Sequence, residues 1–403
     1  MKIAILGAGA AGFFSAINIK EFFPKHEVDI LEKSDKVLRK VRISGGGRCN
    51  VTHSCFQVED LIKNYPRGQK ELRSAFHIFQ PENTIQWFAK RGVKLHTEED
   101  GRMFPVSNSS ETIVNCFLEE IKKKQINLLT EMKLQGIFRE GDSFLLQSEE
   151  GFQKKYDRVL FATGSDRTSW KWLTALGHSI IEPIPSLFSF HIHDESLQSL
   201  QGLSIDKLSL SLEEKKYRQS GSLLFTHEGL SGPAVLKLSS FAAPYFHDKQ
   251  YNTKLFIHWL GDKNLEEIRN VLTLIKIREG NKKVKNTNPP EIPTRAWEML
   301  CDKAGIEKDT TWPHLSKKQF QTLQELLYKT EYKICGKSTF KDEFVTCGGV
   351  HLKEVDFKTM QSKLIPGIYF AGEVLNIDGI TGGFNFQNAW TGAYIAALNI
   401  GKP

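Results

Sequence analysis

The sequence GAGAAG at residues 7–12 decides the fold of this chain. An apolar run at Lys2–Leu6 precedes it, and a helix-forming stretch follows it and ends before Pro24. A second apolar run, Glu27–Leu31, ends in the acidic residue Glu32. The order strand, glycine-rich turn, helix and strand, with an acid after the second strand, predicts a Rossmann dinucleotide-binding unit.

Each glycine of this turn has a physical task. Gly7 allows the tight turn, Gly9 lets the backbone approach a pyrophosphate, and Gly12 lets the helix pack closely on the strand. The first turn of the helix offers free N–H groups and a partial positive charge to phosphates. The acid after the second strand can accept hydrogen bonds from a ribose. The expected cofactor-binding residues here are Gly7, Gly9, Ala10, Ala11, Gly12, Glu32 and Lys33.

A basic run from Lys33 to Arg48 leads into SGGGRCN at residues 44–50. Three consecutive glycines are entropically costly and are useful where backbone must touch a ligand, because successive N–H groups can form an anion-binding nest. A solvated charged face is the alternative for the basic run. Arg48 is suited equally to a phosphate or a substrate carboxylate, and Cys49 either to packing or to redox chemistry with Cys55. The expected contacts are Ser44, Gly45, Gly47, Arg48, Cys49 and Asn50.

Two later strands end in glycine-rich turns of the kind that binds a flavin. The strand Asp157–Ala162 ends in Thr-Gly, and a buried strand at 366–371 ends in Gly-Glu. The segment 378–385 then opens a helix, whose N-terminal dipole can stabilise negative charge on the pyrimidine end of a reduced flavin. The expected contacts are Thr163, Gly164, Gly372, Glu373, Asp378, Gly382, Gly383, Phe384 and Asn385.

Composition limits the class of protein, its location and its partners. The chain has 403 residues, of which 40% are hydrophobic and 25% charged, as in a globular protein of two or three domains. The six cysteines form no C-x-x-C pair, so we expect no metal site, no disulfide framework and a cytoplasmic location. A net charge of +7 spread over this length predicts no nucleic-acid partner, and no apolar run is long enough to predict a membrane span.

In the middle of the chain, the spacing of apolar residues predicts short strands first and helices afterwards. Short strands are expected at 126–129, 134–139 and 144–148, forming a small meander. Alternation at 208–212 and 255–259 predicts a small antiparallel sheet or barrel, and the period between Leu265 and Tyr328 is helical. Within the barrel, His227 lies in a glycine-rich loop, where it is either a structural residue or a general acid or base.

Six motifs resemble the aminoacetone-oxidase and bile-acid-reductase-like flavoproteins, and the likeness runs nearly end to end. They are SGGGRCN at 44–50, GRMFP at 101–105, FTHEGLSGP at 225–233, TMQSK at 359–363, FAGEV at 370–374 and DGITGGFNFQ at 378–387. The resemblance implies an α/β fold, with a Rossmann-like FAD-binding domain interrupted by an insert of a small β-barrel and a helical subdomain. The expected bounds are 1–186 with 342–403 for the FAD domain, 187–262 with 331–341 for the barrel, and 263–330 for the helices.

The resemblance also implies roles for individual residues. Glu32 would bind the adenosine ribose, and the backbone of Leu134 would lie near the adenine. Glu373, Asp378 and the segment 382–385 would lie near the ribityl chain and ring. Gly9 to Gly12, Lys40, Ser44 and Gly45 would lie along the phosphates. The chain departs from the family after Gly164, where the usual glycine-rich loop is replaced, and at Asn376, where an aspartate is usual.

Three functions follow from these observations. The first is an FAD-dependent oxidoreductase that transfers hydride between the flavin and a small organic substrate, bound where the Phe225–Pro233 loop faces the ring. The second is an NAD(P)H-dependent flavin reductase of an enone-like substrate. Because the chain holds one G-x-G-x-x-G, NAD(P)H would visit the flavin face without a second Rossmann domain. The third is a flavin-bound RNA-modifying or interaction protein.

Overall fold

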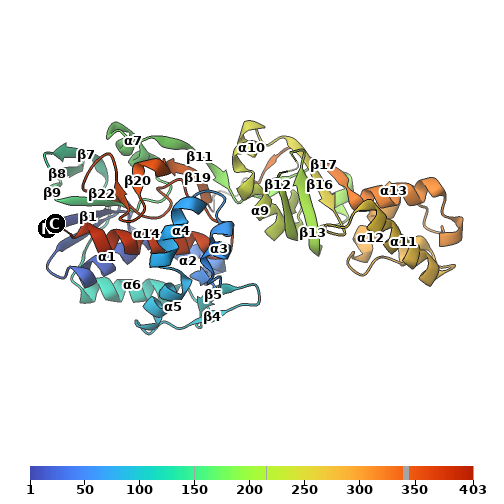
Figure 1. Ribbon diagram of the computed structural model, residues 1–403, viewed down its shortest axis with the longest axis horizontal. Coiled ribbons are helices and arrows are strands. Elements are labelled where there is room, and N and C mark those ends of the chain that lie inside the picture. The colour runs from blue at the N-terminus through green and yellow to red at the C-terminus, as the bar shows by residue number, and fades with distance from the viewer. Residues whose placement is uncertain (149, 215, 339–344, 403) are drawn as a thin grey trace. The chain divides into compact units, whose positions relative to one another are not determined.

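The computed structural model describes residues 1–148, 150–214, 216–338 and 345–402 and contains two compact units (Figure 1). One unit comprises Met1–Pro183 with Val345–Pro403, and the other comprises Ile184–Phe344. A Rossmann-type α/β unit interrupted by an insert confirms the predicted fold class. The finer division of the insert into a barrel and a helical part, with its bounds, stays a prediction.

The first unit is built on a seven-stranded sheet with the order β20-β21-β22-β10-β1-β2-β6. The strands from β22 to β6 are parallel, and β1 is paired on both sides, with β2 and β10. Its apolar side chains are fully buried, as expected for a central parallel strand. The bounds are β1 Lys2–Leu6, β2 Glu27–Leu31, β6 Asn127–Leu129, β10 Arg158–Phe161, β20 Val355–Asp356, β21 Gln361–Ser362 and β22 Ile368–Phe370.

Helix α1 (Ala10–Phe22) lies beside helix α14 (Phe384–Ile400), although they are at opposite ends of the sequence (Figure 1). Phe14 packs on Trp390 with 5.2 Å between ring centroids, and Phe22 packs on Tyr394 at 5.5 Å. The two helices therefore run in the same direction, and their N-termini lie at the same end. The other helices of this unit are α2 Arg39–Gly47, α3 Val58–Leu61, α4 Gln69–Ile78, α5 Pro81–Ala89, α6 Glu111–Lys123 and α7 Arg167–Ala175.

Small sheets complete the first unit. The prediction that 126–129 belongs to a meander is wrong, because β6 pairs in parallel with β2 of the main sheet and the meander is β7-β8-β9. The chain leaves this unit along β11 and returns along β19, and these two strands pair. The bounds are β3 Thr52–His53, β4 Leu95–Thr97, β5 Arg102–Pro105, β7 Leu134–Glu140, β8 Ser143–Ser148, β9 Gln153–Tyr156, β11 Ile180–Ser186 and β19 Val345–Val350.

The second unit contains a seven-stranded antiparallel sheet with the order β17-β16-β13-β14-β15-β12-β18. One hydrophobic core joins this sheet to its helices, including Leu210 of the sheet and Trp297 of α12. The strands are β12 Phe190–His191, β13 Ser204–Leu212, β14 Arg218–Phe225, β15 Gly229–Ser231, β16 Thr253–His258, β17 Thr330–Ile334 and β18 Gly336–Lys337. The helices are α8 Glu195–Gln198, α9 Pro233–Phe241, α10 Ala243–Asp248, α11 Leu265–Glu279, α12 Thr294–Lys303 and α13 Lys317–Tyr328.

A search of the described residues for a helix with the length and hydropathy of a membrane span finds none.

The close packing of α1 on β1 gives a prediction about stability. A Cβ on Gly12 would lie 2.0 Å from the carbonyl oxygen of Gly7, which is rigid backbone. Overpacking of this kind costs about 3 kcal/mol, against a gain of about 1 kcal/mol from the higher helix propensity of alanine. We therefore expect Gly12→Ala to lower the urea midpoint of the FAD-free protein.

The matched control for this experiment is Gly9→Ala. Among the described residues, a Cβ on Gly9 would meet no atom within 4 Å outside its chain neighbours and its own helix. We expect the midpoint of Gly9→Ala to equal that of the unmodified chain. Equal midpoints for both variants would contradict the packing argument.

Candidate flavin site

The glycine-rich turn lies where three parallel strands end. The N–H of Gly7 donates to the carbonyl of Leu31 at 2.8 Å, and a Cβ on Gly7 would lie 2.6 Å from the carbonyl oxygen of Ala162. The turn is therefore pressed between the ends of β2 and β10, and its positive φ of 101° is one that glycine adopts readily. Gly9, by contrast, faces the open space described above. This difference matches the tasks expected of the two glycines.

The N-terminus of α1 is suited to an anion. Gly9 is the N-cap and has no side chain to occupy the first N–H groups. The first turn that follows, Ala10-Ala11-Gly12-Phe13, is uncharged. The N–H groups and the positive end of the helix dipole therefore point into the open space at Gly9, which a pyrophosphate can fill.

Glu32 is held at the end of β2, next to the turn. Its Oε2 accepts from the N–H of Ala8 at 2.9 Å, and its Oε1 accepts from the N–H and hydroxyl of Ser34 at 3.0 Å each. These bonds fix the carboxylate between the glycine-rich turn and the start of the basic run. Each carboxylate oxygen has further lone pairs, so the group can still accept from ribose hydroxyls.

Leu134, expected near the adenine, begins β7 close to this acid. The N–H of Met132 donates to the carbonyl of Glu32 at 2.8 Å, and the N–H of Glu131 donates to the carbonyl of Ser34 at 3.1 Å. The same region contains a hollow lined by Lys33, Ser34, Asp35, Glu131, Lys133 and Glu150. The adenosine end predicted from the sequence is therefore an open polar surface.

The segment SGGG forms an arch at the end of α2. Ser44 is extended, with a ψ of 147°, and Gly45, Gly46 and Gly47 have φ values of 58°, 68° and 84°. A Cβ on Gly46 would meet no described atom within 4 Å, whereas one on Gly45 would lie 2.8 Å from the ring of Phe104. One side of the arch is thus packed and the other is open, as a backbone contact to a ligand requires.

Two residues beside the arch have protein partners of their own. Arg48 pairs with Glu98 at 2.6 Å, and its guanidinium lies 4.0 Å from the centroid of the Phe104 ring. Cys49 is fully buried, and burial raises the pKa of its thiol to about 12, although the Ser44 hydroxyl opposes this change. At neutral pH this thiol is therefore protonated and packed, which favours the packing role over the redox role.

Residues from both ends of the chain meet at this edge. A Cβ on Gly372 would lie 3.4 Å from the Cβ of Ala11, so the last parallel strand ends beside the first turn of α1. Lys40 forms an ion pair with Glu373 at 2.5 Å, and a Cβ on Gly164 would lie 3.7 Å from Oε2 of Glu373. The end of β10, the end of β22 and helix α2 therefore share one surface.

Lys33 lies further along this edge. It forms an ion pair with Asp166, which also caps helix α7 by accepting from the N–H of Ser169 at 2.8 Å. The hydroxyl of Ser169 lies 2.8 Å from that of Thr163. The segment after Thr163 is thus a capped helix in place of the glycine-rich loop usual in the resembling family.

Asp378 has a partner that the sequence did not reveal. Its fully buried carboxylate makes two hydrogen bonds with the guanidinium of Arg67, which comes from the opposite end of the sequence. Burial raises the pKa of the nearby Cys347 thiol to about 11, with Arg67 lowering it and Asp378 raising it. The ion pair fixes the loop before α14, and Cys347 stays a neutral thiol.

The N-terminus of α14 is held by contacts on several sides. Asn50, with its amide oriented to satisfy both polar atoms, accepts from the N–H of Gly383 at 3.0 Å. Asn385 both accepts from the N–H of Gly379 at 2.8 Å and donates to its carbonyl at 2.9 Å. The ring of His53 stacks on Phe384 at 4.7 Å. These contacts fix a second helix N-terminus at the edge where α1 also begins.

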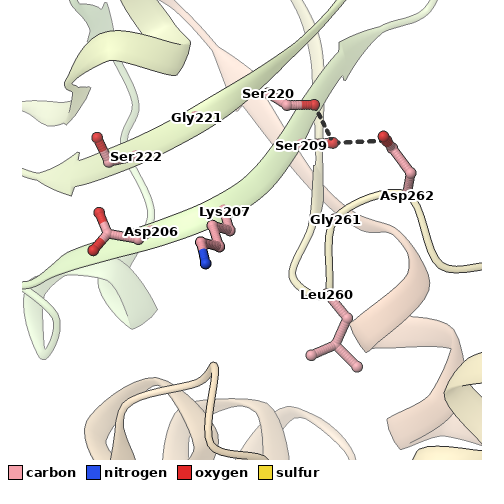
Figure 2. Close-up of a pocket in the computed structure, with 9 residues that line it drawn as sticks. All are labelled: Asp206, Lys207, Ser209, Ser220, Gly221, Ser222, Leu260, Gly261 and Asp262. Atoms are coloured by element: carbon pink, nitrogen blue, oxygen red, sulfur yellow. Dashed lines mark hydrogen bonds between the residues drawn. The ribbon is translucent and has the colours of Figure 1, made fainter. Parts of the chain in front are cut away.

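The insert holds two further features. His227 is 67% exposed in the turn between β14 and β15, and its Nε2 lies 3.6 Å from Oε1 of Glu228. A separate hollow is lined by polar groups, among which Ser209 donates to Asp262 at 2.9 Å and bonds Ser220 at 2.7 Å (Figure 2). Neither feature assigns a catalytic group, and the expected role of the loop around His227 stays a prediction.

The structure thus brings the predicted residues of the first unit to one edge of the parallel sheet. Their individual contacts with the cofactor stay predictions. Sequence reasoning missed Arg67, His53 and Asp166, because each acts on a residue that only folding brings close.

A Rossmann unit with two helix N-termini at the carboxyl edge of its sheet suits a dinucleotide cofactor. Together with the family and relatives described next, it identifies the chain as an FAD-dependent oxidoreductase. The chain belongs to the HI0933-like protein Rossmann domain family, whose profile matches residues 1–399.

Three comparisons place this family membership in context. The "Ribosomal RNA dihydrouridine synthase" of Haemophilus influenzae is 30% identical over 99% of this chain and 98% of its own. The "3-dehydro-bile acid delta(4,6)-reductase" of Clostridium scindens is 23% identical over 98% of each. The solved 3-ketosteroid delta1-dehydrogenase of Sterolibacterium denitrificans has a TM-score of 0.52 and 10% identity over 98% of both chains, which is a likeness of fold.

The open space at Gly9 gives a prediction about the cofactor. A valine side chain there would occupy the place of the pyrophosphate, so we expect Gly9→Val to weaken FAD binding by roughly 100-fold. The ratio of bound flavin to protein, measured by absorbance after gel filtration, reports the loss. An unchanged melting temperature of the FAD-free variant is the control for folding. Full retention of FAD by this variant would show that the pyrophosphate lies elsewhere.

Proposed function

We propose that this chain uses its flavin to reduce uridine to dihydrouridine in ribosomal RNA. The observation that carries the proposal is the match to the ribosomal RNA dihydrouridine synthase of Haemophilus influenzae, which spans almost the whole of both chains. The proposal combines two alternatives left open by the sequence, the enone-like substrate and the RNA-modifying protein. It replaces the expectations of a small-molecule substrate and of no nucleic-acid partner.

The chemistry is the reduction of a carbon–carbon double bond conjugated to a carbonyl group. In uracil, hydride adds to the ring carbon farther from that carbonyl, and a proton adds to the nearer one. Bound FAD in its reduced form supplies the hydride, and a reductant such as NAD(P)H restores it. One relative is named for forming dihydrouridine and the other as a bile-acid reductase, so both names describe addition of hydrogen to a double bond.

The residues of the first unit have positioning roles in this reaction. The N-terminus of α1 and the arch at 44–47 are suited to hold the diphosphate. The ion pair of Arg67 with Asp378 and the two hydrogen bonds of Asn385 keep the second helix N-terminus rigid. Where the flavin ring binds at this helix N-terminus, the helix dipole would favour negative charge on its pyrimidine end.

The overall charge supports an anionic partner. The chain carries 54 lysine and arginine residues against 47 acidic residues, a net charge of +7. A positive field raises the rate at which a polyanion is encountered, and that effect falls with added salt. The charge alone did not predict RNA, but it is compatible with RNA once the relatives are taken into account.

A second candidate is a reductase of a steroid-like enone. The observation that favours it is the end-to-end match to the bile-acid reductase at 23% identity. The same flavin chemistry serves this substrate. The two candidates differ in their substrate, so an assay that offers both substrates distinguishes them.

The test supplies both substrates to the FAD-loaded protein with NADPH or NADH in the absence of oxygen. Ribosomal RNA is taken from cells in which the gene is disrupted and is incubated with the protein. The RNA is then digested to nucleosides and analysed by mass spectrometry. We expect dihydrouridine to form in the RNA, and the bile-acid enone to stay unchanged. The Gly9→Val variant, which should bind FAD roughly 100-fold more weakly, is the matched control and should form much less dihydrouridine.

Other outcomes decide against the proposal. Reduction of the enone with no dihydrouridine would favour the second candidate. If the flavin is reduced by the nicotinamide but neither substrate is changed, both candidates are wrong.

A further inference from the structure

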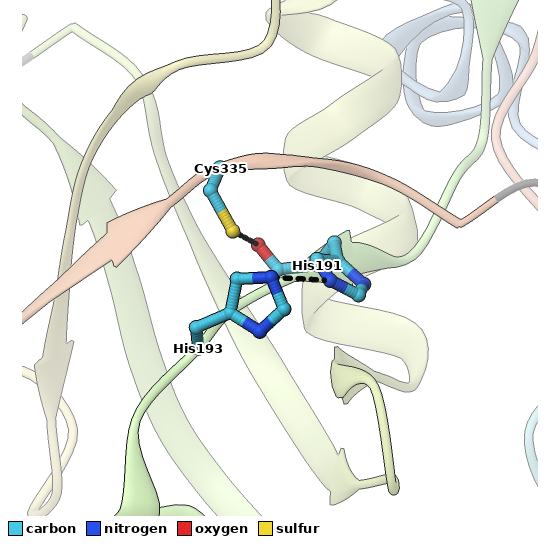
Figure 3. A group of neighbouring side chains, drawn as sticks. All are labelled: His191, His193 and Cys335. Carbon is cyan, nitrogen blue, oxygen red and sulfur yellow. Dashed lines mark hydrogen bonds between the residues drawn. The ribbon is translucent and has the colours of Figure 1, made fainter.

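We propose that His191, His193 and Cys335 bind a zinc ion in the inserted unit. The Nε2 atoms of the two imidazoles lie 3.0 Å apart. One ring nitrogen of each histidine and the thiol sulfur all lie within 4.8 Å of one another. Figure 3 shows the two rings and the sulfur gathered at one point of the sheet. The cluster lies outside the flavin unit, and no step of the proposed reaction uses it.

Backbone pairing brings these residues close together. His191 lies on β12 directly opposite Gly336 of β18, the residue after Cys335. The N–H of Cys335 donates to the carbonyl of His191 at 3.0 Å, and its thiol lies 3.3 Å from the same oxygen. His193 follows His191 by two residues, a spacing that returns to the same side of an extended chain. The backbone therefore holds the three residues close together before any ion binds.

The donor set matches zinc in kind and supplies three of its four ligands. Zinc takes four ligands in a tetrahedron, with bonds of about 2.0–2.1 Å to imidazole nitrogen and about 2.3 Å to thiolate sulfur. Those bond lengths place ligand atoms roughly 3.3–3.6 Å apart, a spacing that the cluster can reach through side-chain rotations. Two nitrogens and one sulfur leave a fourth position for water.

The burial of the cluster allows an ion to enter. His193 is exposed, and His191 and Cys335 are half-buried. Binding replaces the thiol proton with the metal, so one proton is released to solvent and no electron is transferred. A soft thiolate with two imidazoles favours zinc over the hard cations magnesium and calcium.

The site would tie together the first and last strands of the inserted sheet. β12 begins six residues after Ile184, and β18 ends at Lys337, before the chain returns to the first unit at Val345. A metal that joins them closes the insert at the two points where the chain enters and leaves it. Zinc that binds the folded unit in preference to the unfolded chain would stabilise the insert.

The first test measures zinc in the full-length protein, purified without a histidine tag. After removal of metal with a chelator, zinc is titrated against a chromophoric competitor. We expect about one zinc ion per chain, and loss of binding in His193→Ala and in Cys335→Ser. The matched controls are His227→Ala, an exposed histidine of the same unit, and Cys55→Ser, a half-buried cysteine of the other unit. Both controls should bind zinc normally.

The second test uses the reactivity of the thiols. Zinc should slow alkylation of Cys335 by roughly tenfold, because a metal-bound thiolate is shielded, and should leave Cys55 unchanged. Cobalt in place of zinc should give a thiolate-to-metal absorption band that Cys335→Ser abolishes. Neither readout responds to a cluster held only by hydrogen bonds.

Two results would overturn the proposal. One is the absence of stoichiometric zinc binding by the folded, unmodified chain. The other is zinc binding that persists in both His193→Ala and Cys335→Ser, which would place the ion elsewhere. Neither result bears on FAD binding or on RNA reduction, so the two proposals fail separately.

Discussion

The contact between α1 and β1 is the constraint on which the flavin unit depends. A side chain on Gly12 would meet the carbonyl oxygen of Gly7 at 2.0 Å, so the helix can lie this close only because position 12 is glycine. The close approach fixes the helix N-terminus above the carboxyl edge of the parallel sheet. Every other group of the site is positioned relative to that edge, because β10 and β22 end there too.

The last sixty residues complete a site that the first fifty begin. Gly372 lies against Ala11, and Lys40 pairs with Glu373. The parallel alignment of α1 and α14 brings a second positive helix end to the same place as the first. A cofactor with a diphosphate in its middle and an electron-accepting ring at one end is suited to two such helix ends. The insert can interrupt the sequence between them because β11 and β19 pair where it leaves and returns.

The sequence predicted what depends on neighbours along the chain. Glycines whose backbone conformation or close packing requires them mark three features in the sequence. These are the turn at 7–12, the arch at 44–47 and the start of α14. Partners far apart in sequence could not be predicted in the same way. Arg67 and Asp378 are 311 residues apart, and nothing in either local sequence indicates the other.

The partners of a strand were likewise not predictable from its local sequence. The run at 126–129 was recognised as a strand but assigned to the wrong sheet, because a short apolar run does not specify its neighbour. The side chains of the proposed zinc site are another example, since Cys335 lies 144 residues from His191. Their spacing is unlike that of the short metal motifs that sequence patterns reveal.

Hydrogen–deuterium exchange with and without FAD tests the central claim most directly, namely that one cofactor joins both ends of the chain. The account predicts slower exchange on FAD binding at 7–14, 44–50 and 379–388 together, with little change in α11 of the insert. Protection confined to 7–14, with 379–388 unchanged, would contradict it.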